Sequence, residues 1–376
     1  MTTRLYSAEF IFPGHPDKLS DAIADALVLA AYQREERALV GVEVAVHRNR
    51  VFVTGRIACT DADTIDVSAL VREVYRSAGY GKGWYPAPEE LVVESHLCVG
   101  PLEEGEAAFR ELSDDQAICI GYANNLPQTN HLPVEQWLVR RLARRLYALR
   151  LEQPELQLGP DGKVIVLVRE AEAEAEAEAA WSLESLSCSL QQKNKADDVA
   201  LHRAVRLAVE AELRAAAGDL PGLSATVPEQ LTVNGAGAFE VGGPEGDNGL
   251  SGKKLVVDAY GPRVPIGGGA WSGKDFYKAD RAGGLHARRL AKFIVQAGLA
   301  PEATVTLQWC PGEREARVLD IHTPPGSTAV PAGIATRVDL SLARSGATFP
   351  ISAIVEVARW GHFERGDVPW ETGQRI

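Results

Sequence analysis

The chain has 376 residues, of which 45% are hydrophobic and 24% are charged, so it is long enough for two or three domains with separate cores. Its formal net charge of −12 argues against nucleic acid as the main partner, because binding to phosphate backbones requires a basic surface. The five cysteines form no C-x-x-C pair, which is typical of reduced thiols rather than of a disulfide or zinc framework.

The sequence shows neither a signal peptide nor a membrane span. The N-terminus lacks a basic region followed by an apolar run and a small-residue cleavage site. No apolar stretch reaches the roughly 18 residues that a transmembrane helix needs. We therefore expect a cytoplasmic protein that does not contact a membrane.

Long helices and strands are predicted to alternate along the chain. Apolar residues at helical spacing predict helices at residues 17–33, 134–151, 200–217 and 280–297. We expect Gly218 to end the third of these helices and Gly298 to cap the fourth. Alternating or continuously apolar runs predict strands at residues 40–46, 50–57, 90–99, 164–168 and 303–310, with further strand-like runs broken by glycines in 231–258. The recurrence of strands followed by a long helix indicates three similar α+β units.

Two segments between these elements carry charges without an evident function. The arginines of the second helix (Arg140, Arg141, Arg144 and Arg145) are interpreted as a solvated face rather than a basic patch. Residues 170–178 alternate Glu and Ala, which fits an exposed strand by its period and a helix by its composition. We assign this segment no function.

The stretch GGGAWSGKDFYKADR at residues 267–281 is the most informative part of the chain. Its glycines allow backbone N–H groups to approach an anion closely, and its lysines supply compact positive charge. Gly268 to Lys274 has the G-x-x-x-x-G-K spacing of a phosphate-binding loop, but Asp275 stands where that motif has a Ser or Thr for magnesium. These residues predict a polyphosphate site that is not an ordinary P-loop.

Two further motifs carry the same kind of chemistry. GHPDK at residues 14–18 places an imidazole, a carboxylate and an ammonium at the predicted start of a helix. GGPEGDNGLSGKK at residues 242–254 surrounds one carboxylate and two lysines with glycines, more than a turn requires. The two glycine-rich loops could form one cationic cradle for a triphosphate, with Asp17 and Asp280 available to a magnesium ion.

Together with the late segment RWGHFERGDVPWE, these motifs resemble those of the methionine adenosyltransferase (S-adenosylmethionine synthetase) family, in the family's order. The resemblance implies an α+β fold of three similar α/β-sandwich units around a pseudo-threefold axis. Its units would span residues 1–104, 105–230 and 231–376. It also implies a homodimer or homotetramer with active sites at the subunit interface.

The resemblance further implies that the sulfur of methionine attacks C5′ of ATP and expels the triphosphate, which is then hydrolysed to pyrophosphate and phosphate. By position, His15 would stabilise the departing oxygen. The remaining roles carried over are phosphate binding by Lys163, Lys253, Lys254, Lys274 and Lys278; ATP binding by Asp115 and adenine stacking by Phe239; methionine binding by Asp247, Lys278 and Arg56; Mg²⁺ binding by Asp17 and Asp280; and K⁺ binding by Glu43.

The departures from the family pattern fall mainly on the methionine side. Arg56 stands where the family has a glutamate for the methionine ammonium, and residues 112–117 read LSDDQA in place of a glycine-rich GAGDQG loop. Asp114 could compensate for Arg56, or Arg56 could face a different acceptor. Alternatives to S-adenosylmethionine formation are therefore another nucleophile, simple ATP hydrolysis to phosphates, or a weakly active regulatory subunit.

Overall fold

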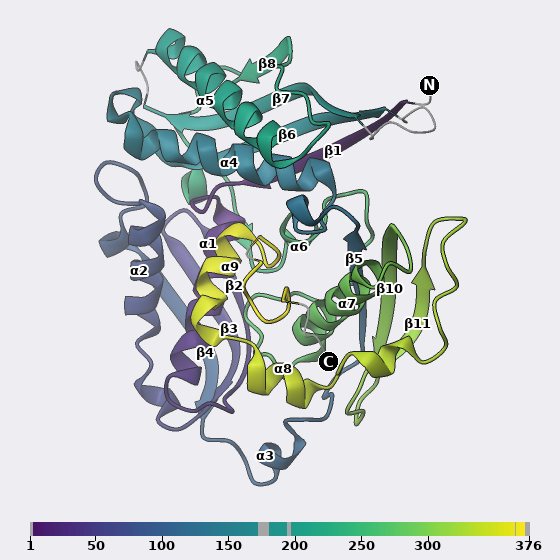
Figure 1. Cartoon of the computed structure of the whole chain (residues 1–376). Helices are drawn as coiled ribbons and strands as arrows, with labels where there is room; N and C mark the ends of the chain where they lie inside the picture. Colours follow the sequence, from purple (N-terminus) through teal and green to yellow (C-terminus); the bar gives the residue numbers. More distant parts are fainter. Residues whose placement is uncertain (1–2, 172–179, 194–196, 365, 373–376) are drawn as a thin grey trace.

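The computed structural model describes residues 3–171, 180–193, 197–364 and 366–372. Most of the Glu-Ala repeat, residues 172–179, lies outside these ranges. Within them, helices and strands form three sheets, each packed against long helices, as the sequence predicts (Figure 1). None of these helices combines the length and hydropathy that a membrane span requires.

The first sheet has the order β4-β3-β2-β9 and carries α1 and α2 on one face. Its hairpin of β2 and β3 is antiparallel, with His47 paired to Arg50, so these two predicted strands are joined by a tight turn. A C-terminal helix, α9, packs on α1. The elements are β2 (Leu39–His47), β3 (Arg50–Ala58), β4 (Val92–Gly100), β9 (Gly249–Leu250), α1 (Pro16–Tyr32), α2 (Val67–Ala78) and α9 (Ile354–Trp360).

The other two sheets repeat this arrangement of strands against helices. The second, β1-β6-β7-β8, packs on α4 and α5, and the third, β11-β10-β5, packs on α7. Their elements are β1 (Thr3–Ile11), β6 (Leu158–Ala171), β7 (Ala180–Gln192), β8 (Gln230–Val233), β5 (Ala117–Asn124), β10 (Glu302–Trp309), β11 (Arg317–His322), α4 (Val134–Glu152), α5 (Asp198–Asp219) and α7 (Ala279–Gln296). Shorter helices are α3 (Glu106–Phe109), α6 (Leu255–Asp258) and α8 (Leu342–Thr348).

The three units are interlaced along the chain. β1 pairs with β6, β5 pairs with β10, and β9 extends the sheet of β2, so each sheet takes a strand from outside the range expected for its unit. The division at residues 104 and 230 therefore stays a prediction about sequence units. Figure 1 shows the sheets at the left, top and right of the molecule, with α1, α4 and α7 toward its centre.

Three expectations about local structure were wrong. Residues 231–258 form only two short strands, β8 and β9, and otherwise turns and α6. Gly218 does not end α5, which continues to Asp219. The arginines of α4 are not a solvated face: Arg140 is buried and donates to the Ala259 carbonyl at 2.7 Å, and the other three form ion pairs. The amphipathic pattern could not show that acidic side chains from α5 and the C-terminal segment reach this face.

Candidate functional site

One face of α1 carries three carboxylates that hold both glycine-rich loops. Side chains four residues apart lie on the same face of a helix, and Asp17, Asp21 and Asp25 have this spacing. All three are buried. They accept hydrogen bonds from the backbone N–H groups of Leu250, Gly252 and Gly273, at 3.0, 2.8 and 2.8 Å respectively. The loops thus find on α1 the acceptors that a strand partner would otherwise supply.

Asp21 and Asp25 were missed as site-forming residues at the sequence level. The apolar run 22–32 made Asp25 look like an interruption, although its i+8 spacing from Asp17 was a usable signal. Asp25 forms a fully buried, two-pronged ion pair with Arg281, at 2.7 and 2.9 Å. Arg281 also donates to the Lys274 carbonyl at 3.0 Å, so this pair fixes the loop that carries Lys274.

Two residues of the sequence motifs are structural instead. Lys18, in GHPDK, is fully buried, forms an ion pair with Asp258 and donates to the Ala358 carbonyl at 2.9 Å. Asp275 is also buried, pairs with Arg110 at 2.7 Å and accepts from the Val40 N–H at 2.8 Å. Neither side chain is available to a ligand.

The first cluster of predicted site residues surrounds a cavity of about 360 Å³. His15, Lys163, Phe239 and Asp247 all line it, although they come from three separate parts of the sequence. His15 caps α1, and its Nδ1 accepts the Asp17 N–H at 3.2 Å, which leaves Nε2 to carry the imidazole proton. Burial lowers the pKa of His15 to about 4, and the negative charge of Asp17 offsets this effect only in part. The imidazole is therefore neutral at physiological pH and can donate a hydrogen bond through Nε2.

A carboxylate and three lysines lie beside this cavity. Lys254 approaches Asp17 Oδ2 to 3.3 Å, Lys253 approaches Oδ1 to 3.7 Å, and Lys163 forms an ion pair with Glu9. Asp17 Oδ2 is buried and has no hydrogen-bond partner among the described residues. Such an oxygen is suited to a hard cation. Within the described ranges, no group of three or more His, Cys, Asp or Glu side chains is arranged to hold a metal by itself.

The second cluster is formed around the 267–281 loop, where cations are paired with acids. Lys274 forms an ion pair with Asp280, and Lys278 forms one with Asp114. A Cβ atom added to Gly269 would lie 2.1 Å from Asp280, so the glycine is required for the approach of this carboxylate. Asp115 is exposed and its side chain accepts the Gln116 N–H at 2.7 Å.

Arg56 does not face an empty pocket. Its guanidinium forms a two-pronged ion pair with Glu106, at 2.7 and 2.8 Å, and a further contact to Glu103 at 3.3 Å. Glu106 is the first residue of α3, and Glu103 lies just before this helix. The positive charge of Arg56 is thus neutralised within the chain, which the sequence comparison of single positions could not reveal.

The two clusters lie at different heights along β2. Leu250, whose N–H is bound by Asp17, is the strand neighbour of Ala45, whereas Lys274 is the bridge partner of Gly41. Four residues of a strand span about 13 Å. Hence the clusters are separate on one chain, and we call them the first and the second half-site. Glu43 is exposed on β2 between them, opposite Thr54 of β3.

Comparisons with known proteins identify relatives of this chain. Residues 3–93 match the family model for the S-adenosylmethionine synthetase N-terminal domain, and residues 241–372 match that for its C-terminal domain. The chain is 32% identical to S-adenosylmethionine synthases of Thermosynechococcus vestitus and Thermus thermophilus, covering 99% of this chain and 96% and 97% of theirs. A solved structure described as an unusual S-adenosylmethionine synthetase from Campylobacter jejuni superposes with a TM-score of 0.83 at 25% identity, over 98% of this chain and 97% of that one.

Proposed function

This chain belongs to the S-adenosylmethionine synthetase family, and we propose that its two half-sites together form S-adenosylmethionine from ATP and methionine. The observation that carries this proposal is the convergence of His15, Lys163, Phe239 and Asp247 on one cavity. That cavity offers an aromatic ring, a neutral imidazole, an ammonium and a carboxylate. These four groups are suited to bind a nucleoside phosphate and an amino acid. We also propose a cytoplasmic location, consistent with five free cysteines.

The reaction is an in-line displacement at C5′ of ATP. The methionine sulfur forms a bond to C5′ as the C5′–O5′ bond breaks, and the triphosphate leaves with the bonding electrons. Water then cleaves the triphosphate to pyrophosphate and phosphate. His15 donates from Nε2 to the oxygen that gains charge, and Lys163, Lys253, Lys254, Lys274 and Lys278 hold the phosphates. Fixed cations of this kind stabilise developing charge without reorganisation.

The donor set fits a Mg²⁺ ion bound jointly by protein and substrate. Asp17 offers a buried carboxylate oxygen that forms an ion pair with Lys254 but has no hydrogen-bond partner among the described residues, and Asp280 offers a second carboxylate, which is paired with Lys274. Magnesium commonly takes one or two carboxylates and completes its shell with phosphate oxygens and water. When bound, it would neutralise charge on the leaving triphosphate. We further propose that the exposed carboxylate of Glu43 serves a K⁺ site.

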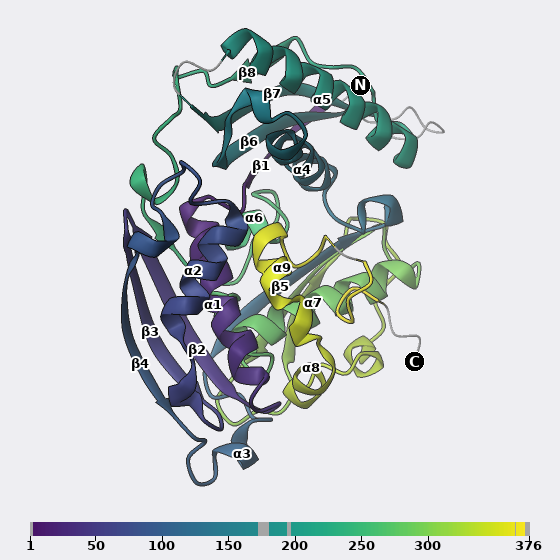
Figure 2. The same cartoon turned by 90° about the vertical axis from the view of Figure 1, so that its left-hand side faces the viewer.

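We propose that a second copy of the chain joins the half-sites, in a homodimer or homotetramer. Within the described residues, α1 and α2 cover one side of the β4-β3-β2 sheet, and Figure 2 shows the other side at the edge of the molecule. Phe52, Val92 and Leu250 are exposed there by 42%, 39% and 44%. Large apolar side chains at an open sheet face are typical of an interface. Two copies related by a twofold axis could bring the first half-site of one against the second half-site of the other.

One experiment tests the reaction. The purified chain is incubated with ATP, Mg²⁺ and K⁺, with and without methionine, and the nucleoside product is identified by mass. We expect S-adenosylmethionine only when methionine is present. Adenosine or phosphate release that ignores methionine would indicate a different acceptor or ATP hydrolysis, and no turnover would indicate a regulatory subunit.

A second experiment tests the assembly. Phe52→Asp should reduce the molar mass measured by light scattering and abolish turnover, because it places a charge on the apolar face. Leu151→Asp is the matched control, since Leu151 is 75% exposed on α4, away from this sheet. An unchanged mass and rate for Phe52→Asp would show that the interface lies elsewhere.

A further inference from the structure

A separate cavity of about 570 Å³ lies in the C-terminal part of the chain. It is formed by the later turns of α7, the segment 335–344 that leads into α8, and residues 370–372. It shares no lining residue with the cavity around Phe239. Arg289 lies nine residues beyond Asp280 on α7, which is about 13 Å along the helix axis.

Arg289 is fixed in this cavity by neutral partners. It donates to the Asp339 carbonyl at 2.7 Å and to His286 Nδ1 at 3.0 Å. His286 is fully buried, and its Nε2 lies 2.9 Å from the Ser341 carbonyl, so the proton is on Nε2 and Nδ1 is an acceptor. Burial, and then Arg289, lowers the pKa of His286 to about 3. The imidazole therefore orients the guanidinium without adding or removing charge.

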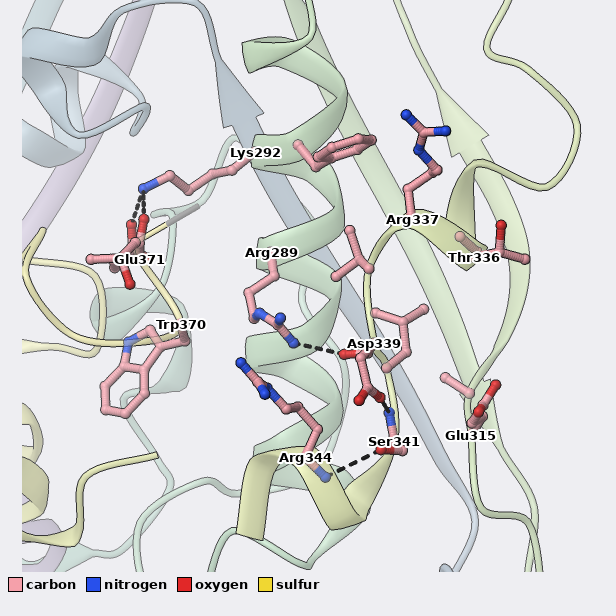
Figure 3. A pocket seen from close by; sticks show the side chains of 16 residues that line it. Arg289, Lys292, Glu315, Thr336, Arg337, Asp339, Ser341, Arg344, Trp370 and Glu371 are labelled. Atoms are coloured by element: carbon pink, nitrogen blue, oxygen red, sulfur yellow. Dashed lines mark hydrogen bonds and ion pairs between the residues drawn. The ribbon is translucent and has the colours of Figure 1, made fainter. Parts of the chain in front are cut away.

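A second guanidinium approaches Arg289. Figure 3 shows Arg289 and Arg344 extending toward one another between Trp370 and Asp339, whereas Arg337 points away. In the described part of the chain, neither Arg289 nor Arg344 has a carboxylate within ion-pair distance. Burial, and then Arg344, lowers the pKa of Arg289 to about 10, only partly offset by Asp339. Two partly buried like charges in one cavity are unfavourable unless an anion lies between them.

The acidic side chains that line the cavity do not supply this counter-charge. Glu371 is already bound by Arg288 at 3.0 Å and by Lys292 at 2.7 Å. Asp339 accepts the Ser341 N–H at 3.0 Å and lies outside ion-pair distance of Arg289. Glu315 is exposed at the rim.

We propose that this cavity binds a small oxyanion, carrying phosphate or carboxylate groups, between Arg289 and Arg344. Planar guanidinium groups match the geometry of both anions. The hydroxyl of Ser341, which accepts the Arg344 N–H at 3.1 Å, can add a donor. The volume lies within the roughly 300–1,000 Å³ of small-molecule sites. The proposal does not depend on the function assigned to the half-sites.

Isothermal titration of the full chain with inorganic phosphate, and separately with malonate, tests the proposal. We expect one anion to bind, and Arg344→Gln and Arg289→Gln each to weaken it at least about tenfold, which is about 1.4 kcal/mol. Arg314→Gln is the control, because this arginine is exposed nearby but does not line the cavity. Lys274→Ala removes a cation of the proposed triphosphate site and should leave this binding unchanged. The anion that binds more tightly identifies the class of ligand.

The opposite results would overturn the proposal. If neither anion binds, or if Arg344→Gln binds as the wild type does, the arginines are merely solvated. If Lys274→Ala abolishes binding, the anion occupies the triphosphate site instead. Arg344 is partly exposed at the start of α8, so its variant should fold, and thermal unfolding checks this. Loss of turnover in the methionine assay would contradict the proposed function without affecting these outcomes.

Discussion

Reversing the charge of Arg56 should release residues 103–106 from the sheet, and reversing Glu106 as well should restore their position. The Arg56–Glu106 contact is two-pronged, but the side chains are 36% and 21% exposed, so solvent screening limits the pair to about 1 kcal/mol. In Arg56→Glu this attraction is lost and a repulsion of similar size replaces it. The form in which residues 103–106 are docked on the sheet should therefore lose about 2 kcal/mol of stability. This corresponds to a roughly 30-fold shift of the equilibrium toward the released form.

Hydrogen exchange of the amides at residues 103–108, measured alongside the KM for methionine, gives the readout. Arg56→Glu and Glu106→Arg should accelerate exchange by similar factors, and the double variant should return toward the wild type, since the pair is coupled. The KM should follow the exchange rate. If Arg56→Glu changes the KM while Glu106→Arg changes neither quantity, then Arg56 contacts the substrate directly and the reasoning is wrong.

Three other variants test the α1 carboxylates and His15. Asp25→Ala should lower the free energy of unfolding in urea by about 3–5 kcal/mol, because it leaves the buried Arg281 unpaired. The double variant with Arg281→Ala should lose less stability than the two single variants lose together. Losses that simply add would contradict a coupled ion pair. His15→Ala should lower kcat about 100- to 1,000-fold. His15→Gln should retain more activity, because its amide can donate a hydrogen bond from near the Nε2 position. Equal losses of kcat in both variants would argue against a hydrogen-bond role for His15. Burial raises the pKa of Asp21 from 3.8 to about 8. Between pH 3.8 and about 8, the folded chain therefore holds a proton on Asp21 that the unfolded chain has lost. The free energy of unfolding consequently falls as the pH rises through this range. Asp21→Asn keeps the acceptor for Gly252 and should flatten this fall in pH-dependent urea titrations, and an unchanged slope would show that Asp21 ionises normally.

Local patterns predicted four long helices and five of the strands, whereas the roles of the residues in the first half-site came from the family resemblance and stay predictions. Apolar spacing is a property of neighbouring residues, so α1, α4 and α7 could be placed to within one or two residues. The direction of a charged side chain is not local. Lys18 sits in a motif with His15, yet its partner Asp258 is 240 residues away and directs it into the core. Because the motif GHPDK is the same whichever way its lysine points, the sequence could not show that Lys18 is structural while His15 lines the cavity.

The departures from the family pattern can be interpreted only when each altered residue is considered together with its ion-pair partner. Taken alone, Arg56 places a positive charge where a carboxylate is expected, which suggested a different acceptor. Glu103 and Glu106 surround it, however, and these three side chains together carry a net negative charge. Asp114 in turn pairs with Lys278. Charged residues in the altered loops thus compensate one another across segments that lie far apart in sequence, so the net charge around Arg56 depends on the docking of residues 103–106.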